Sequence, residues 1–468
     1  MDVGFGSGQP AGVSYYAART SKRTLPIRCL RAENLDAALK ALPAGARQWA
    51  AHVGFEAKPG EVVTLPDAEG APGEVWLGLP ARPTLWDFAV LPGKLASGRY
   101  AFDESLPEGM AEAASLAWGL AQYRFERYKS APKSTKELVW PTGVDRAEVT
   151  RLLEAMTLSR DLVNTPAEDM NPAALADEAK KLAKKHGAKV SVIVGDKLLE
   201  KGYPTIHAVG RAAAVAPRLI DLSWGRPRDP KLTLVGKGVC FDSGGLDLKP
   251  ASGMLMMKKD MGGSAIVLGL AHAIMSAGLR VRLRVLVPAV ENAVSGNAFR
   301  PLDVIKTRKG LTVEVGNTDA EGRLILCDAL AEASAEKPEL ILDFATLTGA
   351  ARVALGTDLP ALFSTSDTFA AQMVGAGDEV ADPYWRMPLH QPYRKQLESR
   401  VADMSNVGGS YGGAITAALF LQSFVGTESE WAHVDVMAWN LSDKPGRPTG
   451  GEAMGLRAAY AALVDRYS

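Results

Sequence analysis

LTVEVGNTDAEGRLILCDALAEASAEK, residues 311–337, passes from a strand pattern through a charged turn into a helix pattern. The same alternation continues on both sides of this stretch. Strands are predicted at 188–194, 231–237, 279–290 and 338–349, and helices at 172–185, 264–277 and 414–425. Such alternation predicts an α/β domain with a largely parallel sheet and helices on both faces. The charged turn then falls at the carboxyl end of a strand, where the active sites of such folds lie.

The N-terminal part of the chain is expected to form a second, smaller α/β domain. Strand-like runs at 61–65 and 74–79 mix there with Ala-rich helical stretches at 33–42 and 110–128. Pro and Gly in VWPTGVD, residues 139–145, mark its end. Apolar residues at helical spacing from Val149 then predict a helix that stops before the Asn-Thr-Pro at 164–166. The predicted organisation is an N-terminal α/β domain at 1–145, an interdomain helix at 146–165 and a larger C-terminal α/β domain at 166–468, with a mostly parallel mixed sheet flanked by helices.

The composition is that of an ordinary globular protein, since 47% of the 468 residues are hydrophobic and 23% are charged. Lys plus Arg and Asp plus Glu both total 53, so no net charge attracts nucleic acid or an acidic membrane surface. Cys29, Cys240 and Cys327 form no CxxC motif, which argues for a reducing compartment and against a thiolate zinc site. The first 23 residues lack the apolar core of a signal sequence, and no run approaches the ~18 apolar residues of a membrane span. We therefore expect a cytoplasmic protein without a membrane partner, and nucleic acid is not indicated.

Charged residues gather in two stretches that each begin at a predicted strand end, 234–263 and 317–324. Together the two stretches supply Lys237, Asp242, Lys249, Asp260, Asp319, Glu321 and Arg323. The first stretch also holds seven glycines, which allow close backbone approach to a ligand. Four converging carboxylates repel one another unless cations neutralise them, and two divalent ions balance four carboxylates. Carboxylate oxygens suit Mg²⁺, Mn²⁺ and Zn²⁺, so the pattern predicts a two-metal site.

These motifs closely resemble those of the leucine aminopeptidase (cytosol aminopeptidase) family of di-metal exopeptidases. The resemblance begins with VGKG, FDSGG, a lysine and DM, followed by the octapeptide NTDAEGRL. The intervals match as well, with five residues from Lys237 to Asp242, seven more to Lys249 and eleven more to Asp260. SRDLVNTPAEDMNP, DFATLTGA, GGAITAALFLQSFV and WAHVDV extend the resemblance from about residue 150 to the C-terminus. The octapeptide is a very specific signature, whereas the N-terminal third shows no close resemblance.

The resemblance implies a role for each charged residue. One metal ion, Mn²⁺ or Zn²⁺, would be ligated by Lys237, Asp242, Asp260 and Glu321, and a second by Asp242, Asp319 and Glu321. Lys249 would polarise the scissile carbonyl and stabilise the oxyanion. Arg323 would hold a bicarbonate that acts as general base on a metal-activated water.

The resemblance also implies a substrate and an assembly. Peptides with a free N-terminus would lose an apolar, leucine-like first residue, and the protein would form a homohexamer. The side chain of that residue would contact Met257, Thr346, Leu347, Thr348, Gly349 and Ala350. Met437 departs from the family pattern, which usually has a small residue after WAHVDV, and both a core role and a pocket role stay open for it.

Two other functions remain as alternatives. GGSYG, residues 408–412, fits the GxSxG pattern of serine hydrolases, but VADMSNV before it is a poor strand and His433 is the one histidine downstream. A non-catalytic or DNA-binding oligomer is the other alternative, because some members of the family also bind DNA. The complete set of charged residues and the zero net charge lend it no support.

Overall fold

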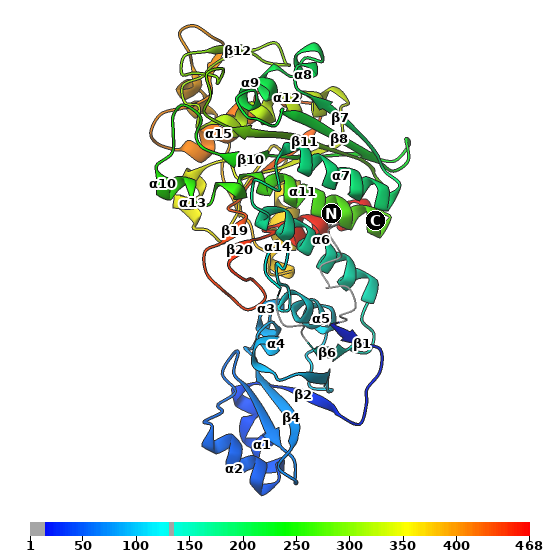
Figure 1. Ribbon diagram of the computed structural model, residues 1–468. Helices are drawn as coiled ribbons and strands as arrows, with labels where there is room; N and C mark the ends of the chain where they lie inside the picture. Colours follow the sequence, from blue (N-terminus) through cyan, green and yellow to red (C-terminus); the bar gives the residue numbers. More distant parts are fainter. Residues whose placement is uncertain (1–14, 131–134) are drawn as a thin grey trace. The chain divides into compact units, whose positions relative to one another are not determined.

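The computed structural model describes residues 15–130 and 135–468 (Figure 1). The chain forms two compact units, one of residues up to Thr157 with Ser442–Thr449 and one of Leu158–Leu441 with Gly450–Ser468. Helix α6 (Arg146–Asn164) runs through the boundary at 157, where the apolar periodicity predicts a helix. Residues 1–14 lie outside the described residues. They form the first part of the 23-residue N-terminal stretch that is expected to lack a signal sequence.

The N-terminal unit is built on a six-stranded sheet in the order β1-β6-β5-β2-β4-β3. Neighbouring strands are parallel except β3 and β4. The strands are β1 (Tyr16–Ala17), β2 (Thr24–Leu30), β3 (Val62–Pro66), β4 (Pro72–Gly78), β5 (Gly98–Phe102) and β6 (Lys136–Val139). The helices are η1 (Ala32–Asn34), α1 (Leu35–Ala41), α2 (Ala44–His52), α3 (Leu85–Phe88), α4 (Leu91–Lys94) and α5 (Ala111–Leu120).

Helix α5 is shorter than the helical stretch predicted at 110–128. The N–H groups of Gln122 and Tyr123 donate to the carbonyls three residues back, at Gly119 and Leu120, which closes a tight turn. Composition alone therefore overestimates the length of this helix.

The C-terminal unit contains a nine-stranded mixed sheet, which confirms the predicted fold class. The order is β16-β15-β18-β14-β9-β11-β8-β7, with β10 also paired to β11, and the central strands β18, β14, β9 and β11 run parallel. The strands are β7 (Lys189–Val194), β8 (Arg218–Trp224), β9 (Lys231–Gly236), β10 (Gly238–Asp242), β11 (Arg282–Asn292), β14 (Leu340–Ala345), β15 (Ala361–Ser364), β16 (Trp385–Arg386) and β18 (Glu430–Asp435). All six residues of β14 and five of six in β9 are buried, as expected for parallel strands covered on both faces.

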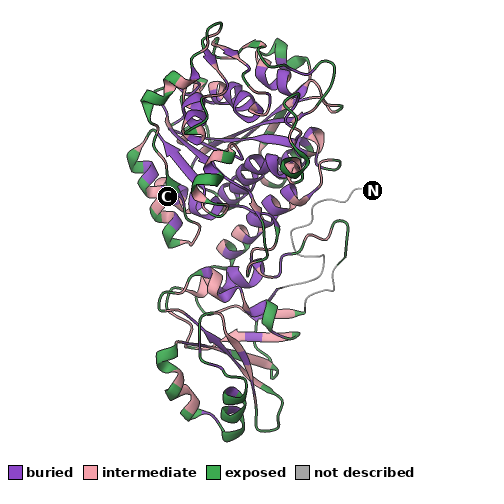
Figure 2. Ribbon diagram, turned by 90° about the vertical axis from the view of Figure 1, so that its left-hand side faces the viewer, coloured by how far each residue is buried: buried purple, intermediate pink, exposed green. Residues whose placement is uncertain are grey.

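Helices cover both faces of this sheet. Helices α11 and α7 pack on one face and α12 and α9 on the other, and Figure 2 shows the sheet between them as mostly buried. The helices are α7 (Pro172–His186), α8 (Lys197–Glu200), α9 (Pro204–Gly210), α10 (Ala251–Met254), η2 (Met257–Met261), α11 (Gly262–Ala277), α12 (Glu321–Ala335), α13 (Gly349–Leu355), α14 (Asp367–Glu379), η3 (Gln391–Leu397), α15 (Gly413–Gln422) and α16 (Leu456–Tyr467). Helix α11 approaches β14 so closely that a Cβ on Gly263 would lie 2.1 Å from the Phe344 carbonyl oxygen. A glycine at this point lets the segment that carries Asp260 lie against the end of β14.

The strand before the octapeptide does not belong to the central sheet, contrary to prediction. Strand β13 (Thr312–Glu314) lies in a separate three-stranded sheet with β12 (Val304–Lys306) and β17 (Met404–Ser405). It has three residues, of which Val313 alone is fully buried, too few to form a strand covered on both faces. A further pair, β19 (Trp439–Asn440) and β20 (Gly450–Gly451), forms a two-stranded ribbon.

Within residues 15–130 and 135–468, one helical stretch, Met257–Ala277, is long and apolar enough to cross a membrane, which the sequence inspection did not anticipate. In the fold, 89% of its apolar window is buried. Its hydrophobicity is that of a core helix, packed against the sheet on one side and against α7 and α16.

Candidate metal centre and active site

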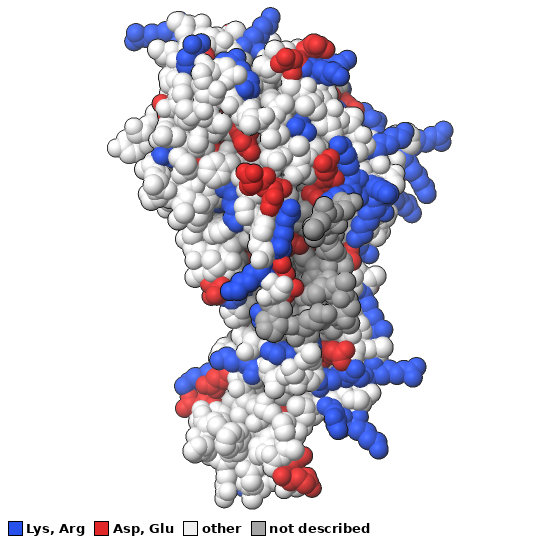
Figure 3. All heavy atoms as spheres, in the orientation of Figure 1, with Lys and Arg blue, Asp and Glu red and all other residues white. Residues whose placement is uncertain are grey.

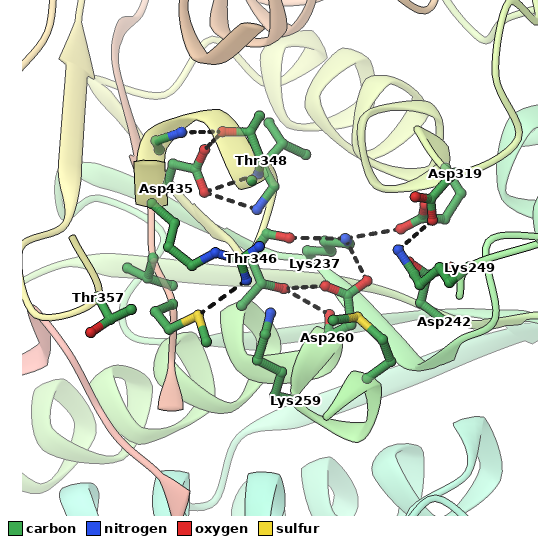
Figure 4. Close-up of a pocket in the computed structure, with 18 of the residues that line it drawn as sticks. Lys237, Asp242, Lys249, Lys259, Asp260, Asp319, Thr346, Thr348, Thr357 and Asp435 are labelled. Atoms are coloured by element: carbon green, nitrogen blue, oxygen red, sulfur yellow. Dashed lines mark hydrogen bonds and ion pairs between the residues drawn. The ribbon is translucent and has the colours of Figure 1, made fainter. Parts of the chain in front are cut away.

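A cavity of about 210 Å³ opens at the carboxyl ends of the central strands (Figure 4). Lys237 follows β9, Thr346 follows β14, and Asp435 and Asp242 end β18 and β10. Eleven residues predicted from the sequence line this cavity, namely Lys237, Asp242, Lys249, Met257, Asp260, Asp319, Glu321, Thr346, Leu347, Thr348 and Gly349. The structure therefore brings both charged stretches to one place, although β13 is not a strand of the central sheet.

Lys237 lies at the centre of the charged cluster. Its backbone is fixed by bonds from its N–H to the Phe344 carbonyl (3.0 Å) and from the Ser264 N–H to its own carbonyl (2.9 Å). Its ammonium lies 2.6 Å from Asp260 Oδ2 and 2.9 Å from Glu321 Oε1. Because the side chain is only 3% exposed, these carboxylates and the cavity replace bulk water around it.

Asp242 is held by the backbone that follows it and by an asparagine. Its Oδ1 accepts hydrogen bonds from the Gly244 N–H and from Asn292 Nδ2, both at 2.9 Å. Its Oδ2 lies 2.9 Å from the ammonium of Lys249, which also contacts Asp319. Burial opposes the charge of Lys249, but Asp242 and Asp319 outweigh it and raise the lysine pKa. Sequence reasoning did not predict the role of Asn292, which reaches this site from the end of β11.

The carboxylates are close enough to share cations. Oxygens of Asp242, Asp319 and Glu321 lie within 4.8 Å of one another. Burial and the charge of Asp242 raise the pKa of Glu321 to about 8 and that of Asp319 to about 6. Burial also opposes the ammonium of Lys237, yet Asp260 and the other carboxylates outweigh it and raise the lysine pKa. These clustered carboxylate oxygens favour added positive charge, and oxygen donors of this kind fit divalent cations.

The loop after β14 is held by Asp435, which the sequence reasoning did not single out. The Oδ1 of Asp435 accepts from the N–H groups of Leu347 (2.9 Å) and Thr348 (3.2 Å), and its Oδ2 accepts from Thr348 Oγ1 (2.6 Å). Thr346 Oγ1 donates to Asp260 Oδ1 at 2.7 Å and so joins this loop to the charged cluster. The signal for Asp435 was its place in WAHVDV, at the end of an apolar run.

The lining of the cavity bears on two further residues. Met437 lines the cavity, with its sulfur 3.8 Å from Arg352 Nη1, and it is at the same time a buried core residue, 8% exposed. Ala350 is not among the lining residues, contrary to expectation, while its neighbours Gly349 and Ala351 are. Ala350 is the second residue of α13 and packs against the apolar cluster that includes Ala414 and Ala418 of α15.

Arg323 lies on the first turn of α12, 8% exposed, and is not among the residues that line the cavity. Its Nη1 donates to the Asn406 carbonyl at 2.7 Å. Burial lowers its pKa to about 10, against the opposing effect of Glu321 and Asp435. This hydrogen bond anchors the buried guanidinium to the backbone at Asn406.

The serine hydrolase alternative finds no support in the geometry. Ser410 is exposed in a loop before α15, and no central strand leads into it. His433, 1% exposed within β18, is bonded through Nδ1 to Asp343 at 2.5 Å. A buried histidine in the sheet cannot serve as base for a serine on an exposed loop.

Family comparisons agree with this geometry. Residues 157–460 match the model for the cytosol aminopeptidase family, catalytic domain. Residues 25–141 match the M17 aminopeptidase N-terminal domain, so the N-terminal third belongs to the same family, although inspection of the sequence found no close resemblance there. A probable cytosol aminopeptidase of Roseiflexus castenholzii is 40% identical over 80% of this chain and 81% of its own length. One from Aquifex aeolicus is 41% identical over 74% of this chain and 72% of its own.

Solved structures show the same fold. The cytosol aminopeptidase from Coxiella burnetii has a TM-score of 0.94 and 48% identity, covering 97% of this chain and 99% of that one. The bottromycin maturation enzyme BotP in complex with Mn has a TM-score of 0.87 and 35% identity, covering 95% of this chain and 100% of that one. These matches extend over both units, and they identify the chain as a peptidase that belongs to the cytosol aminopeptidase family.

Proposed function

We propose that this protein is a metal-dependent aminopeptidase that hydrolyses the peptide bond after the N-terminal residue of a peptide. The observation that carries the proposal is the convergence of Asp242, Asp319 and Glu321, whose oxygens lie within 4.8 Å of one another. The family supports removal of N-terminal residues, and the similarity to BotP, solved with Mn, supports Mn²⁺; Zn²⁺ suits the same oxygen donors.

Five residues would hold two divalent ions. Lys237, Asp242, Asp260 and Glu321 would bind one ion, and Asp242, Asp319 and Glu321 the other. When bound, such ions activate a water and polarise the scissile carbonyl. Lys237 must lose its proton to become a ligand, and a dication takes over the charge that its ammonium supplies to Asp260 and Glu321.

Lys249 is the cation proposed to act on the substrate. It stands at the cavity with a side chain 14% exposed, oriented by Asp242 and Asp319. An ammonium held there donates to the carbonyl oxygen and stabilises the negative charge that develops on it.

Arg323 is proposed to hold a bicarbonate as general base. The support is its anchored position two residues from Glu321 in the first turn of α12, and the planar fork of a guanidinium, which matches a planar anion. Arg323→Met should then abolish the bicarbonate dependence of kcat, measured in degassed buffer with and without added bicarbonate. A variant that keeps the wild-type bicarbonate response would contradict this role.

The N-terminal side chain is proposed to enter the part of the cavity lined by Met257, Leu347 and Met437, which suits an apolar residue such as leucine. Thr346, Thr348 and Gly349 complete that lining. From the resemblance we also propose a cytoplasmic homohexamer.

Metal content and activity test the proposal together. Dialysis against a chelator should abolish hydrolysis of a leucine arylamide, and Mn²⁺ or Zn²⁺ should restore it. Lys237→Arg should lose one metal, because arginine keeps its proton and cannot ligate. Lys249→Arg should keep both metals and lose about 10²–10³-fold in kcat, with part of that recovered by the arginine charge. Full activity without metal would refute the proposal, and equal metal content in the two variants would remove Lys237 from the ligands.

A further inference from the structure

One part of the cavity carries two cations that the proposed peptidase chemistry does not use. Lys259, in η2, lines the cavity although it is only 5% exposed. Arg352, in α13, is an exposed residue of the same lining. Figure 4 shows the Lys259 ammonium pointing into the cavity, away from the cluster of Asp242, Asp319 and Lys249.

Lys259 has no counterion of its own. Across residues 15–130 and 135–468, no side chain forms a hydrogen bond or ion pair with its ammonium. Burial lowers the pKa of Lys259, and the charges of Lys237 and Arg352 lower it further. Asp260 and Asp435 oppose this shift, but both carboxylates are engaged elsewhere. Asp260 is bound by Lys237 at 2.6 Å, and the oxygens of Asp435 accept from the loop after β14. A buried ammonium without a partner is costly, so an anion from a ligand would find an unsatisfied cation here.

The surroundings of Lys259 suit an anion on a short apolar stem. Met257 and Met437 line the same cavity, and the Met437 sulfur is 3.8 Å from Arg352 Nη1. A side chain of one or two methylene groups packs against such residues, while a carboxylate at its end meets Lys259 and the guanidinium of Arg352.

We propose that this aminopeptidase accepts an acidic N-terminal residue, Glu or Asp, whose side-chain carboxylate pairs with Lys259 and Arg352. The inference rests on the proposed function and refines its substrate class. Leucine enters the same space without forming the ion pair. The charge of the side chain, and not its size, therefore distinguishes Glu and Asp from neutral N-terminal residues of similar size.

The test compares residues that differ in charge but not in shape. Arylamides of Glu, Gln and Leu are assayed with the Mn²⁺-loaded enzyme, and kcat/KM is measured for each. We expect the Glu substrate to exceed the Gln substrate by about 10- to 100-fold, the range of a charge-assisted hydrogen bond in an enclosed site. Equal values for Glu and Gln, with Leu hydrolysed, would overturn this inference alone, while no hydrolysis of any of the three would overturn the proposed function with it.

Two variants and a control locate the effect. Lys259→Met should lower the Glu-to-Gln ratio by about 10-fold or more, and Arg352→Gln by less, because Arg352 is exposed to water. Lys258→Met is the matched control: Lys258 donates to the Asn164 carbonyl at 2.6 Å, is not among the cavity lining, and its loss should leave the ratio unchanged. A Glu-to-Gln ratio that falls equally in Lys258→Met and Lys259→Met would overturn the assignment. If Lys259→Met does not fold, the ratios of the wild type and of Arg352→Gln still decide whether the carboxylate is recognised.

A carboxylate could also come from the C-terminus of a dipeptide. Arylamides have none, so a preference seen with them belongs to the N-terminal side chain. If Leu-Gly is hydrolysed faster than its amide, and Lys259→Met removes that difference while the arylamide ratio is flat, Lys259 serves the leaving side and the proposal is overturned.

Discussion

Replacing Gly322 by alanine should disable the active site through Lys237. Gly322 lies in the first turn of α12, and an added Cβ would lie 2.5 Å from Lys237 Cε and 2.7 Å from its Nζ. Ordinary contact begins near 3.4 Å, so the lysine must retreat by about 1 Å from Asp260 and Glu321. A displacement of that size in a reactive group costs about 10²-fold in rate. We expect kcat for a leucine arylamide to fall by about that factor.

Stability should fall as well, although alanine is the better helix former. The substitution gains about 1 kcal/mol of helix propensity. Moving the buried ammonium away from its carboxylates costs at most about 3–5 kcal/mol, the cost of a broken buried pair, so the net loss in the free energy of unfolding without metal is at most about 2–4 kcal/mol. Gly375→Ala in α14 is the control, because its Cβ meets nothing within 4 Å, and it should gain stability with unchanged kcat. If Gly322→Ala behaves like Gly375→Ala in both assays, the reasoning is refuted.

Three further outcomes are expected. Arg160→Met should lower the free energy of unfolding in urea by about 3–5 kcal/mol, because it leaves the buried Glu452 carboxylate without the guanidinium that binds it twice at 3.0 Å. A loss below about 1 kcal/mol would contradict this. Burial raises the pKa of Asp328 from 3.8 to about 6, so its proton stabilises the fold below pH 3.8 and that contribution, about 3 kcal/mol, is lost as pH rises through 6. Asp328→Asn should lack that loss, and identical pH profiles of stability in the two proteins would contradict it. Light scattering should give a mass near six times 49.7 kDa, and a monomer alone would exclude the hexamer.

The charged residues of the site were predictable because they lie in short motifs whose spacing is read directly from the chain. Lys237, Asp242 and Asp260 lie within one stretch of thirty residues, and Asp319 and Glu321 within one turn. Alternation of strand and helix patterns placed that turn near strand ends, and the structure does bring both stretches to one cavity.

What escaped prediction depends on contacts between distant segments. A three-residue strand before the octapeptide has the same local pattern whether it joins the central sheet or a separate one, so the sheet partner of β13 could not be inferred. The letters of MKKDM show two lysines side by side but not that Lys259 faces the cavity and Lys258 faces Asn164. Asn292 and Asp435 were missed for the same reason, since their partners are 50 and 87 residues away.

The assignment of Ser442–Thr449 to the N-terminal unit limits how this chain can be rearranged by recombination or truncation. A cut after Thr157 releases the catalytic module together with a loop whose Arg447 guanidinium normally covers the Trp86 ring at 4.4 Å. The C-terminal fragment then carries the loop Ser442–Thr449 without its packing partners, and the N-terminal fragment loses the guanidinium that covers Trp86. Domain shuffling at a single junction therefore damages both products. A variant without the N-terminal unit therefore also needs a changed sequence in the eight residues Ser442–Thr449, near the C-terminus.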